Sequence, residues 1–571
     1  MLARSIGVRV FRNCARSSRF PSPPAARTVA RRFSSSSPPT AHHAPPSTAH
    51  PLAGVTSQLD HVAPRFEIDP DNIEILDSPT AFYETLKAKI RGARRRIYLS
   101  TLYIGKTEHE LIDTLRQALE DNPNLELSIL TDALRGTRED PEPSCATLLA
   151  PLVSQFGDRV RVSMFHTPNL NGWKKKYMPK RINEGWGLQH MKLYGFDDEI
   201  MLSGANLSND YFTDRQDRYH IFSSKELTDF YAAVHEAVCD LSYTLVPSDQ
   251  RPGGFELISP HERGFPDPLW HTKRFKAYAK QSLEPLIHKK ARQKMFPVPF
   301  TKDKTFVYPL AQFDILLGQP RNMAFLDYEF ATYTSTEKPA LTRLLTNLAD
   351  DERLRNSTWT FTAGYFNIDP DICELLIAAA PEVGKALSGP GTEDFEKACT
   401  VITASPWANG FYGSKGVSGM LPAAYTLLSR RFLRTVAKAG KTDVIQLKEW
   451  RKGTVGEPGG MTYHAKGLWV TLPPQPGPGA DSAAVVDETG PSITVVGSSN
   501  YTKRSYSLDL EIGAMVVTGD EGLKARLKQE TENLQANATV VTQDDLAKID
   551  RRVGLKVRLA LWLVEALGGA L

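Results

Sequence analysis

The chain of 571 residues carries a formal net charge of +4, with 41% hydrophobic and 23% charged residues. This length exceeds one typical hydrophobic core, so two domains are expected, and the ordinary composition is that of a globular protein. The mild charge gives no sign of a nucleic-acid partner. The five cysteines are widely spaced without a C-x-x-C pair, which argues against a disulfide framework or a zinc site and favours a reducing compartment.

The N-terminal segment has the composition of a targeting sequence. No Asp or Glu occurs in the first 59 residues, and eight arginines fall within the first 32. An arginine-rich, acid-poor segment is typical of a mitochondrial transit peptide, which we expect over residues 1–33, although a basic disordered tail has the same composition. Residues 34–68 begin rich in Ser, Pro, Ala and His, and we expect them to be a disordered linker.

Residues 69–245 form a first unit in which predicted strands and helices alternate. Hydrophobic patterning predicts helices over 82–89, 108–120, 144–156 and 225–242, strands over 97–104, 125–131, 160–165 and 218–223, and a hairpin over 189–206. This alternation predicts an α/β sandwich. We expect residues 246–324, rich in Pro, Lys and Arg, to connect this unit to the next, with no role that the sequence reveals.

Residues 325–545 form a second unit that repeats the order of the first. Strands are predicted over 359–366, 399–404, 444–448, 492–500 and 510–517, and helices over 371–380, 420–439 and 521–536. The sequence therefore predicts two tandem α/β domains with pseudo-twofold symmetry. The stretch 473–491, rich in Pro, Gly and Asp, is expected to be a flexible insertion in a hairpin.

The C-terminal residues 546–571 are expected to form an amphipathic helix. Such a helix can lie in a membrane interface or pack on the domain, and the sequence leaves both open. The chain has no run of 18 or more uncharged apolar residues, so no membrane-spanning helix is predicted.

The sequence H-x-K occurs once in each unit, as His190 with Lys192 and as His464 with Lys466. Side chains two positions apart on a strand share a face, so each histidine should project beside its lysine. An ammonium group can neutralise a phosphate oxygen while the imidazole attacks phosphorus or moves a proton. A single strand histidine is most often structural, but the repetition indicates phosphoryl chemistry.

Each H-x-K is followed by a turn of small residues that ends in Asn, and then by a carboxylate. Asn206 and Asn500 end the two turns, and Asp217 and Glu511 each follow 11 residues later. The first asparagine lies 16 residues after its histidine and the second 36, because the second copy contains the insertion. The equal final offset indicates that the two copies are related.

This pattern resembles that of the phospholipase D superfamily over roughly residues 80–540. The resemblance implies that the two motifs meet in one active site and that a covalent phospho-histidine forms. We assign His190 as the nucleophile and His464 as the general acid and base by analogy, and the reverse order stays open. Asp197 completes H-x-K-x4-D and is implied to hold the motif turn, whereas the second copy has Thr471 at that position.

The resemblance also implies roles for the remaining motif residues. The two lysines would bind non-bridging phosphate oxygens, and Asn206 and Asn500 would donate hydrogen bonds to the same oxygens. Asp217 and Glu511 would each accept a hydrogen bond from a histidine Nδ1–H and fix its tautomer. The alternative for these two carboxylates is an acid on the surface of a strand.

Several stretches outside the motifs are similar to the mitochondrial phosphatidylglycerophosphate synthases of eukaryotes. They are residues 100–105, 206–208, 211–212, 215–219, 403–406, 408–411, 463–469, 504–505 and 509–511. This resemblance implies transfer of a phosphatidyl group from CDP-diacylglycerol to sn-glycerol 3-phosphate, with release of CMP, by a peripheral protein on the matrix face of the inner membrane. The alternatives are a phosphatidylserine synthase, a phospholipase or a nuclease of the same superfamily, and a lipid-binding scaffold without activity.

Two basic clusters are weaker candidates for nucleotide or membrane contact. They are Arg94, Arg95 and Arg96 before a strand, and Lys174, Lys175 and Lys176 between two aromatic residues. Cations interleaved with aromatic residues suit an anionic membrane surface, which we expect here, as well as nucleic acid or a solvated loop. No metal-binding motif and no glycine-rich phosphate loop occurs, so we expect no metal and no cofactor. The oligomeric state is not indicated.

Overall fold

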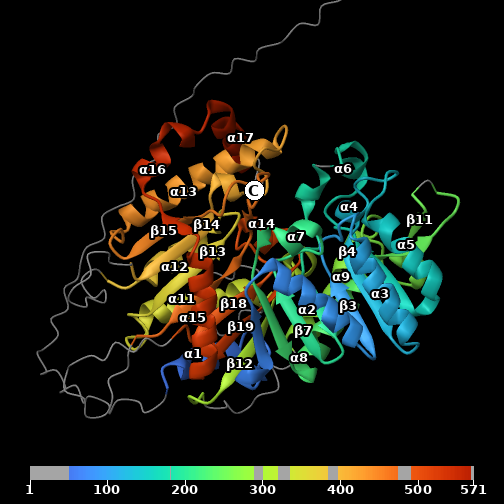
Figure 1. Ribbon diagram of the computed structural model, residues 1–571, viewed down its shortest axis with the longest axis horizontal. Helices are drawn as coiled ribbons and strands as arrows, with labels where there is room; N and C mark the ends of the chain where they lie inside the picture. The colour runs from blue at the N-terminus through green and yellow to red at the C-terminus, as the bar shows by residue number, and fades with distance from the viewer. Residues whose placement is uncertain are drawn as a thin grey trace, which may run out of the picture. The chain divides into compact units, whose positions relative to one another are not determined.

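The computed structural model describes residues 50–180, 182–251, 253–288, 300–318, 335–382, 397–473 and 490–566. The expected transit peptide, residues 1–33, lies outside these residues, as does most of the insertion 473–491. From residue 49 onward the chain forms one compact unit. Its described part contains two nine-stranded sheets, with the blue-to-green first repeat on one side of Figure 1 and the yellow-to-red second repeat on the other.

The first sheet has the strand order β11-β10-β5-β4-β3-β6-β7-β9-β2. Its strands are β2 (Ile73–Leu76), β3 (Arg96–Ser100), β4 (Glu126–Asp132), β5 (Val160–Phe165), β6 (Leu193–Phe196), β7 (Glu199–Ser203), β9 (Tyr219–Ser223), β10 (Tyr243–Pro247) and β11 (Phe255–Ile258). β3, β4 and β5 are parallel, and β6 adds antiparallel to β3. The first H-x-K motif therefore leads into a strand at the centre of the sheet.

The second sheet has the order β1-β12-β19-β18-β17-β13-β14-β15-β20. Its strands are β1 (Phe66–Glu67), β12 (Thr305–Gln312), β13 (Thr358–Ala363), β14 (Cys399–Ala404), β15 (Ile445–Trp450), β17 (Lys466–Thr471), β18 (Ile493–Gly497), β19 (Glu511–Thr518) and β20 (Ala538–Val540). β13, β14 and β15 are parallel, and β17 adds antiparallel to β13. From β2 to β10 and from β12 to β20, the two sheets match strand for strand, which confirms the predicted duplicated α/β fold.

The helices lie outside and between the sheets. They are α1 (Leu52–Asp60), α2 (Pro79–Gly92), α3 (His109–Asp121), α4 (Ala133–Gly136), α5 (Cys145–Phe156), α6 (Gly172–Tyr177), α7 (Asn209–Thr213), α8 (Lys225–Asp240), α9 (Thr272–His288), α10 (Asp314–Leu317), α11 (Glu337–Asp350), α12 (Pro370–Ala378), α13 (Leu421–Lys438), α14 (Lys503–Ser507), α15 (Glu521–Gln535), α16 (Gln543–Ala547) and α17 (Leu555–Ala566). α2, α3 and α5 cover the first core, and α1, α11, α12 and α13 cover the second. A third core, containing α8, α9 and α15, is shared by both repeats.

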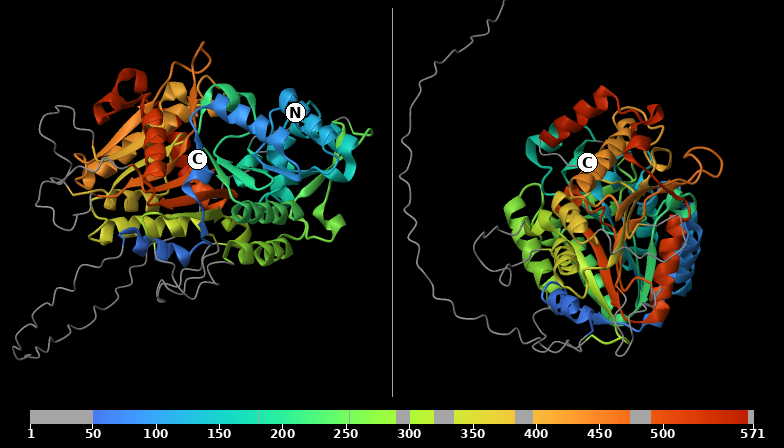
Figure 2. Two further views of the ribbon diagram at one scale, coloured as in Figure 1. Left: turned by 60° about the horizontal axis from the view of Figure 1, so that its bottom comes forward. Right: turned by 90° about the vertical axis from the view of Figure 1, so that its left-hand side faces the viewer.

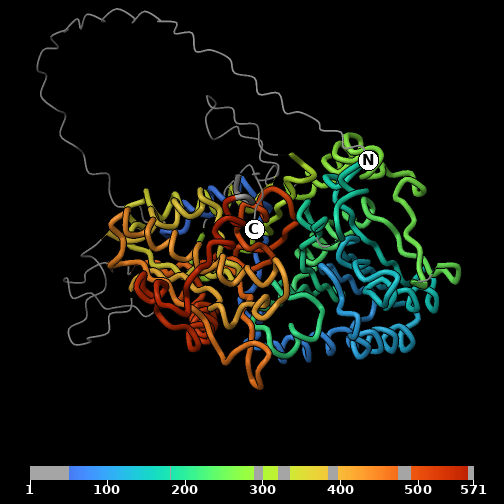
Figure 3. Tube along the Cα trace, turned by 90° about the horizontal axis from the view of Figure 1, so that it is seen from above, coloured from blue at the N-terminus to red at the C-terminus, as the bar shows by residue number. Residues whose placement is uncertain are grey.

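The N-terminal segment departs from the prediction of a linker over 34–68. Residues 52–60 form α1, whose Leu52, Val55 and Leu59 are buried in the core of the second repeat, and β1 extends the second sheet. Figures 2 and 3 show the blue α1 beside the yellow elements of that repeat. The prediction of disorder is therefore wrong for residues 50–68. Their apolar side chains pack against residues that are far away in the sequence.

The second repeat begins earlier than predicted. β12 lies within the expected connecting region 246–324, and all eight of its residues are buried where it pairs with β19. It occupies the place that β2 has in the first sheet. The same region also contains β11 and α9, so it adds ordered elements to both repeats instead of only connecting them.

A buried polar network joins the repeats beneath the site. The Arg218 guanidinium donates to Glu530 and to the carbonyl of Val495, and it stacks on the Trp469 ring at 3.8 Å. A Cβ at position 467 would lie 1.8 Å from Arg218 Nη1, so the residue after Lys466 must be glycine for the two repeats to approach this closely. None of the helices in the described residues is long and apolar enough to cross a membrane.

Candidate active site

Backbone hydrogen bonds hold each H-x-K motif against the other repeat. The amide of His464 donates to the carbonyl of Gln216 at 2.8 Å, beside the short parallel pair of β8 (Arg215–Gln216) and β16 (Thr462–Tyr463). The amide of His190 donates to the carbonyl of Leu510 at 3.0 Å. Gln216 and Leu510 are the residues just before Asp217 and Glu511. Each histidine is therefore fixed next to the carboxylate of the opposite repeat.

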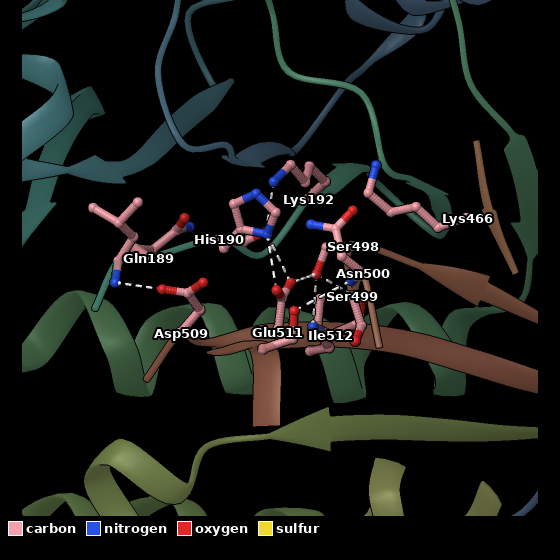
Figure 4. A network of polar contacts seen from close by, with 12 residues as sticks. Gln189, His190, Lys192, Lys466, Ser498, Ser499, Asn500, Asp509, Glu511 and Ile512 are labelled. Carbon is pink, nitrogen blue, oxygen red and sulfur yellow. Dashed lines mark hydrogen bonds and ion pairs between the residues drawn. The ribbon is translucent and has the colours of Figure 1, made fainter. Parts of the chain in front are cut away.

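The side chains complete two crossed pairs. His190 Nδ1 lies 2.9 Å from Glu511, and His464 Nδ1 lies 2.6 Å from Asp217. Both carboxylates are fully buried, and Ser498 Oγ donates to Glu511 at 2.5 Å (Figure 4). An ionised carboxylate accepts the Nδ1–H, which leaves Nε2 with its lone pair free to act as nucleophile or base. The prediction that both carboxylates bind histidines agrees with this geometry. That each carboxylate binds the histidine of the other repeat is seen only in the structure.

The environment favours neutral imidazoles. Burial is the main reason why the pKa of His190 lies below its usual value, and the pKa of His464 lies well below it. Lys192 and Lys466 lower the two pKa values further, whereas Glu511 opposes the shift at His190. Burial alone would raise the pKa of Glu511, but His190 and Lys192 hold it below its usual range. A neutral histidine beside an ionised carboxylate is ready to attack an electrophile.

The two lysines share one contact, to the carbonyl of the motif histidine, and Lys466 Nζ also lies 2.6 Å from His464 Nδ1 and 3.5 Å from Asp217. Lys192 Nζ donates to the carbonyl of His190 at 2.8 Å, and Lys466 Nζ donates to the carbonyl of His464 at 2.7 Å. Both ammonium groups are buried, which lowers the pKa of Lys192 to about 7 and that of Lys466 to about 8. Repulsion between the two lysines contributes to the shift at Lys192. A phosphate between them would relieve this repulsion, so the site is built to receive an anion.

These lysines predict the pH dependence of catalysis. A lysine stabilises phosphate only when it is protonated, which holds below its pKa and is lost above it. We expect kcat/KM to fall as the pH rises through about 7 to 8, the values for Lys192 and Lys466. Bound phosphate stabilises the ammonium forms, so the alkaline limb of kcat should lie at higher pH. Initial rates from neutral to alkaline pH test this, and a kcat/KM that stays level until ordinary lysines titrate would contradict it.

The two asparagines have unused hydrogen-bonding capacity. Asn206 and Asn500 are close to the histidine motifs, and in the described part of the chain the side-chain Oδ1 of each is buried without a partner. Figure 4 shows Asn500 between Glu511 and the lysines. Buried polar atoms normally have partners, and an Oδ1 can only accept, so a ligand hydroxyl could meet it, whereas a phosphate oxygen would bind the Nδ2 of the same amide.

No family model matches this chain. It is 42% identical over 535 residues to the CDP-diacylglycerol–glycerol-3-phosphate 3-phosphatidyltransferase of Saccharomyces pastorianus, with 93% of this chain and 94% of that protein covered. The mitochondrial enzyme of the same name from Homo sapiens is 32% identical, with 89% of this chain and 85% of that protein covered. The chain belongs to the CDP-diacylglycerol–glycerol-3-phosphate 3-phosphatidyltransferase family. The resemblance drawn from the sequence is thereby confirmed.

A solved structure supports the fold independently. The phosphatidylserine synthase of Haemophilus influenzae Rd KW20 superposes with a TM-score of 0.60 at 19% identity, covering 90% of this chain and 97% of that one. At this identity the likeness concerns the fold alone. It confirms the tandem arrangement for this member of the phosphatidyltransferase family.

Asp197 lies away from the reacting groups. Asp197 lies in the tight turn between β6 and β7. Its carboxylate accepts hydrogen bonds from the backbone amides of Arg94, Arg95 and Arg96. These hydrogen bonds hold the motif turn, as the family resemblance implies. Among the described residues, no hydrogen bond or ion pair joins the Asp197 carboxylate to either histidine. Thr471 ends β17 and β18 begins only at Ile493, whereas Asp197 and Asp198 alone join β6 to β7.

The weaker basic candidates are not brought to the histidines. Arg95 pairs with Asp198 and Arg96 with Asp229, at the end of β3 remote from Lys192. Lys174, Lys175 and Lys176 lie on α6, where Lys174 stacks on Trp186 at 4.0 Å. The backbone amides of Arg94 to Arg96 bind Asp197 at the motif turn, and nucleotide or membrane contact by these residues stays a prediction.

Two tyrosines beside His464 were missed by the sequence reasoning. Tyr211 Oη lies 3.3 Å from His464 Nε2, and the rings of Tyr211 and Tyr365 both meet the imidazole edge-on, at centroid distances of 5.1 and 5.3 Å. Tyr211 lies within a stretch that carries the family resemblance. Tyr365 follows β13, and no motif spacing marks it. Both rings therefore lie against the imidazole, and the Tyr211 hydroxyl faces its Nε2.

Proposed function

We propose that this chain transfers a phosphatidyl group from CDP-diacylglycerol to sn-glycerol 3-phosphate, giving phosphatidylglycerophosphate and CMP. The observation that carries the proposal is the pair of crossed histidine–carboxylate contacts around two buried lysines. Membership of the phosphatidyltransferase family, with relatives covered over most of their length, supports the substrates.

In the first step His190 Nε2 attacks the phosphorus that bears the diacylglycerol. The P–O bond to CMP breaks as the P–N bond forms, and CMP leaves with the bonding electron pair. Glu511 accepts the Nδ1–H and stabilises the positive charge that develops on His190. The negative charge of the bound substrate favours a proton on His464 Nε2, and His464 gives this proton to the departing oxygen. The product of this step is a phosphatidyl-histidine.

In the second step the acceptor replaces CMP on the same side. His464 takes the proton from the acceptor hydroxyl, and the resulting oxygen attacks phosphorus while the P–N bond to His190 breaks. Lys192 and Lys466 stabilise the charge on the non-bridging oxygens in both steps, with Asn206 and Asn500 as hydrogen-bond donors. In this scheme the lysines carry the charge that a metal ion carries in other phosphoryl-transfer sites.

An acceptor panel tests this function. Purified protein with labelled CDP-diacylglycerol would be offered glycerol 3-phosphate, serine or water, each with and without a chelator. We expect phosphatidylglycerophosphate from glycerol 3-phosphate, little product from the others, and turnover that survives the chelator. Preferred serine would indicate a phosphatidylserine synthase, preferred water a phospholipase, and the absence of any product a binding scaffold. Each of those results would contradict the proposal.

We further propose a peripheral position on the matrix face of the inner mitochondrial membrane. The animal relatives are named mitochondrial, and two helices expose apolar side chains. These side chains are Trp173 and Tyr177 on α6 and Leu555, Leu559 and Trp562 on α17. Both helices lie at the upper end of the molecule in Figure 1, the end that Figure 3 views. Neighbouring lysines and arginines add attraction to anionic lipid.

This surface predicts how the protein binds vesicles. The full chain should float with anionic vesicles and far less with zwitterionic ones, because burial of the aromatic side chains and charge attraction act together. Trp173→Ser combined with Trp562→Ser should reduce flotation while leaving thermal stability unchanged, since both side chains are exposed. Flotation of this double variant equal to that of the unaltered protein would contradict the assignment.

A further inference from the structure

The two repeats carry the same ion pair with its charges exchanged. Four and nine residues after Asn206 stand Asp210 and Arg215, which pair at 2.8 Å. Four and nine residues after Asn500 stand Arg504 and Asp509, which also pair at 2.8 Å. The cation thus lies beside His464, and the carboxylate occupies the equivalent place beside His190. Because the repeats otherwise match, this exchange makes the two sides of the site electrostatically different.

Arg215 belongs to a cluster of side chains around His464. Its guanidinium lies 4.5 Å from the centroid of the Tyr211 ring, and Nε donates to Thr462 Oγ1 at 3.0 Å. A Cβ at Gly410 would come within 3.0 Å of both Arg215 Nη2 and Tyr365 Oη. Glycine at this position therefore allows the backbone to lie close to the guanidinium and the tyrosine hydroxyl, where a larger residue would press on both.

The groups around Arg215 suit a phosphate. Among the residues the structure describes, no hydrogen-bond partner is found for the Tyr365 hydroxyl, and Asp210 and Thr462 engage only part of the Arg215 guanidinium. An arginine offers a planar fork of donors that matches phosphate oxygens, and stacking on an aromatic ring holds the fork in place. On the opposite side Asp509 takes the place of Arg215, and both Nε and Nη2 of Arg504 donate to Asp509.

We propose that Arg215, with Tyr211 and Tyr365, forms a subsite for the phosphate monoester of the acceptor, glycerol 3-phosphate. The inference rests on the proposed function, in which His464 removes the proton from the acceptor hydroxyl. Tyr211 touches His464 Nε2 through its hydroxyl and Arg215 through its ring face, so one tyrosine separates the two. The departing CMP carries the same chemical group, so the test must distinguish the two sources.

The test compares two acceptors that differ only in the phosphate. Arg215→Gln should lower the ratio of kcat/KM for glycerol 3-phosphate to that for glycerol by about 10- to 100-fold, the range expected when a charge-assisted hydrogen bond is lost. Gly410→Ala, which keeps Arg215 but places a methyl group 3.0 Å from both Arg215 Nη2 and Tyr365 Oη, should lower the ratio in the same direction. The matched control is Asp210→Asn, which breaks the ion pair and leaves the guanidinium in place, and it should largely preserve the ratio.

The possible outcomes separate the alternatives. If Arg215 has only a structural role, Arg215→Gln and Asp210→Asn would weaken both acceptors alike, and the inference would be overturned. If the subsite serves CMP, Arg215→Gln would weaken product inhibition by CMP and leave the acceptor ratio unchanged, which would also overturn it. Failure of the unaltered protein to use glycerol 3-phosphate would instead refute the proposed function itself.

Discussion

Replacing either His190 or His464 with Asn is expected to reduce turnover by about four orders of magnitude or more, because each residue has a chemical role that water does not fill. The two variants should nevertheless stop at different steps. His190→Asn lacks the nucleophile and should release no CMP. His464→Asn keeps the nucleophile and should release one equivalent of CMP, because a phosphate leaving group departs with little help from an acid. It should then stall without a base for the acceptor.

Rapid-quench measurement of CMP in the absence of acceptor distinguishes these cases. A burst in His464→Asn and none in His190→Asn is the expected pattern, and the opposite pattern would show that the roles of the two histidines are exchanged. Asp197→Asn serves as the control. It removes the carboxylate that holds the amides of residues 94–96, so it should lower thermal stability and keep most of the burst.

Loss of either buried carboxylate should reduce activity nearly as much as loss of a histidine. Each loss should impair the histidine of the other repeat. Glu511→Gln and Asp217→Asn are each expected to lower kcat by about 10³- to 10⁴-fold. An amide N–H can donate to Nδ1, which favours the tautomer with the proton on Nε2 and leaves Nε2 without a lone pair for attack or proton transfer. Glu511 contacts His190 and Asp217 contacts His464. Glu511→Gln should therefore resemble His190→Asn, with no CMP burst, and Asp217→Asn should resemble His464→Asn.

The same burst assay decides the pairing. If each carboxylate served the histidine of its own repeat, Asp217→Asn would abolish the burst and Glu511→Gln would retain it. Circular dichroism and thermal melting should accompany the assay, since both residues are buried and their loss also affects stability. A burst pattern that follows the repeats instead of crossing them would contradict the site described above.

Much of the fold could be predicted from the sequence, because its strands are short apolar runs between clear turn signals. The strands expected over 160–165 and 399–404 have those bounds in β5 and β14. β12 was missed because it lies in a region whose composition suggested a connection, and its burial depends on β19, some 200 residues away. Long-range pairing of this kind leaves no local pattern. The same reason explains why residues 52–60 were expected to be disordered.

The motif residues could also be predicted, but their contacts could not. Equal offsets placed Asp217 and Glu511 in equivalent positions, yet the offsets do not say which histidine each carboxylate meets. The crossing follows from the backbone bridges at Gln216 and Leu510, which form only when the repeats associate. One signal was available and not used. Arg215 and Asp509 stand at the same offset with opposite charge, which indicates that the two sides of the site differ.

The most direct test of the central claim, a covalent intermediate shared by two repeats, is to locate the trapped phosphatidyl group. His464→Asn would be incubated with labelled CDP-diacylglycerol without acceptor, digested under alkaline conditions that preserve phospho-histidine, and analysed by mass spectrometry. The account predicts one adduct per chain, on the peptide containing His190, and release of an equal amount of CMP. CMP release that requires the acceptor, with no adduct on either histidine-containing peptide, would contradict it.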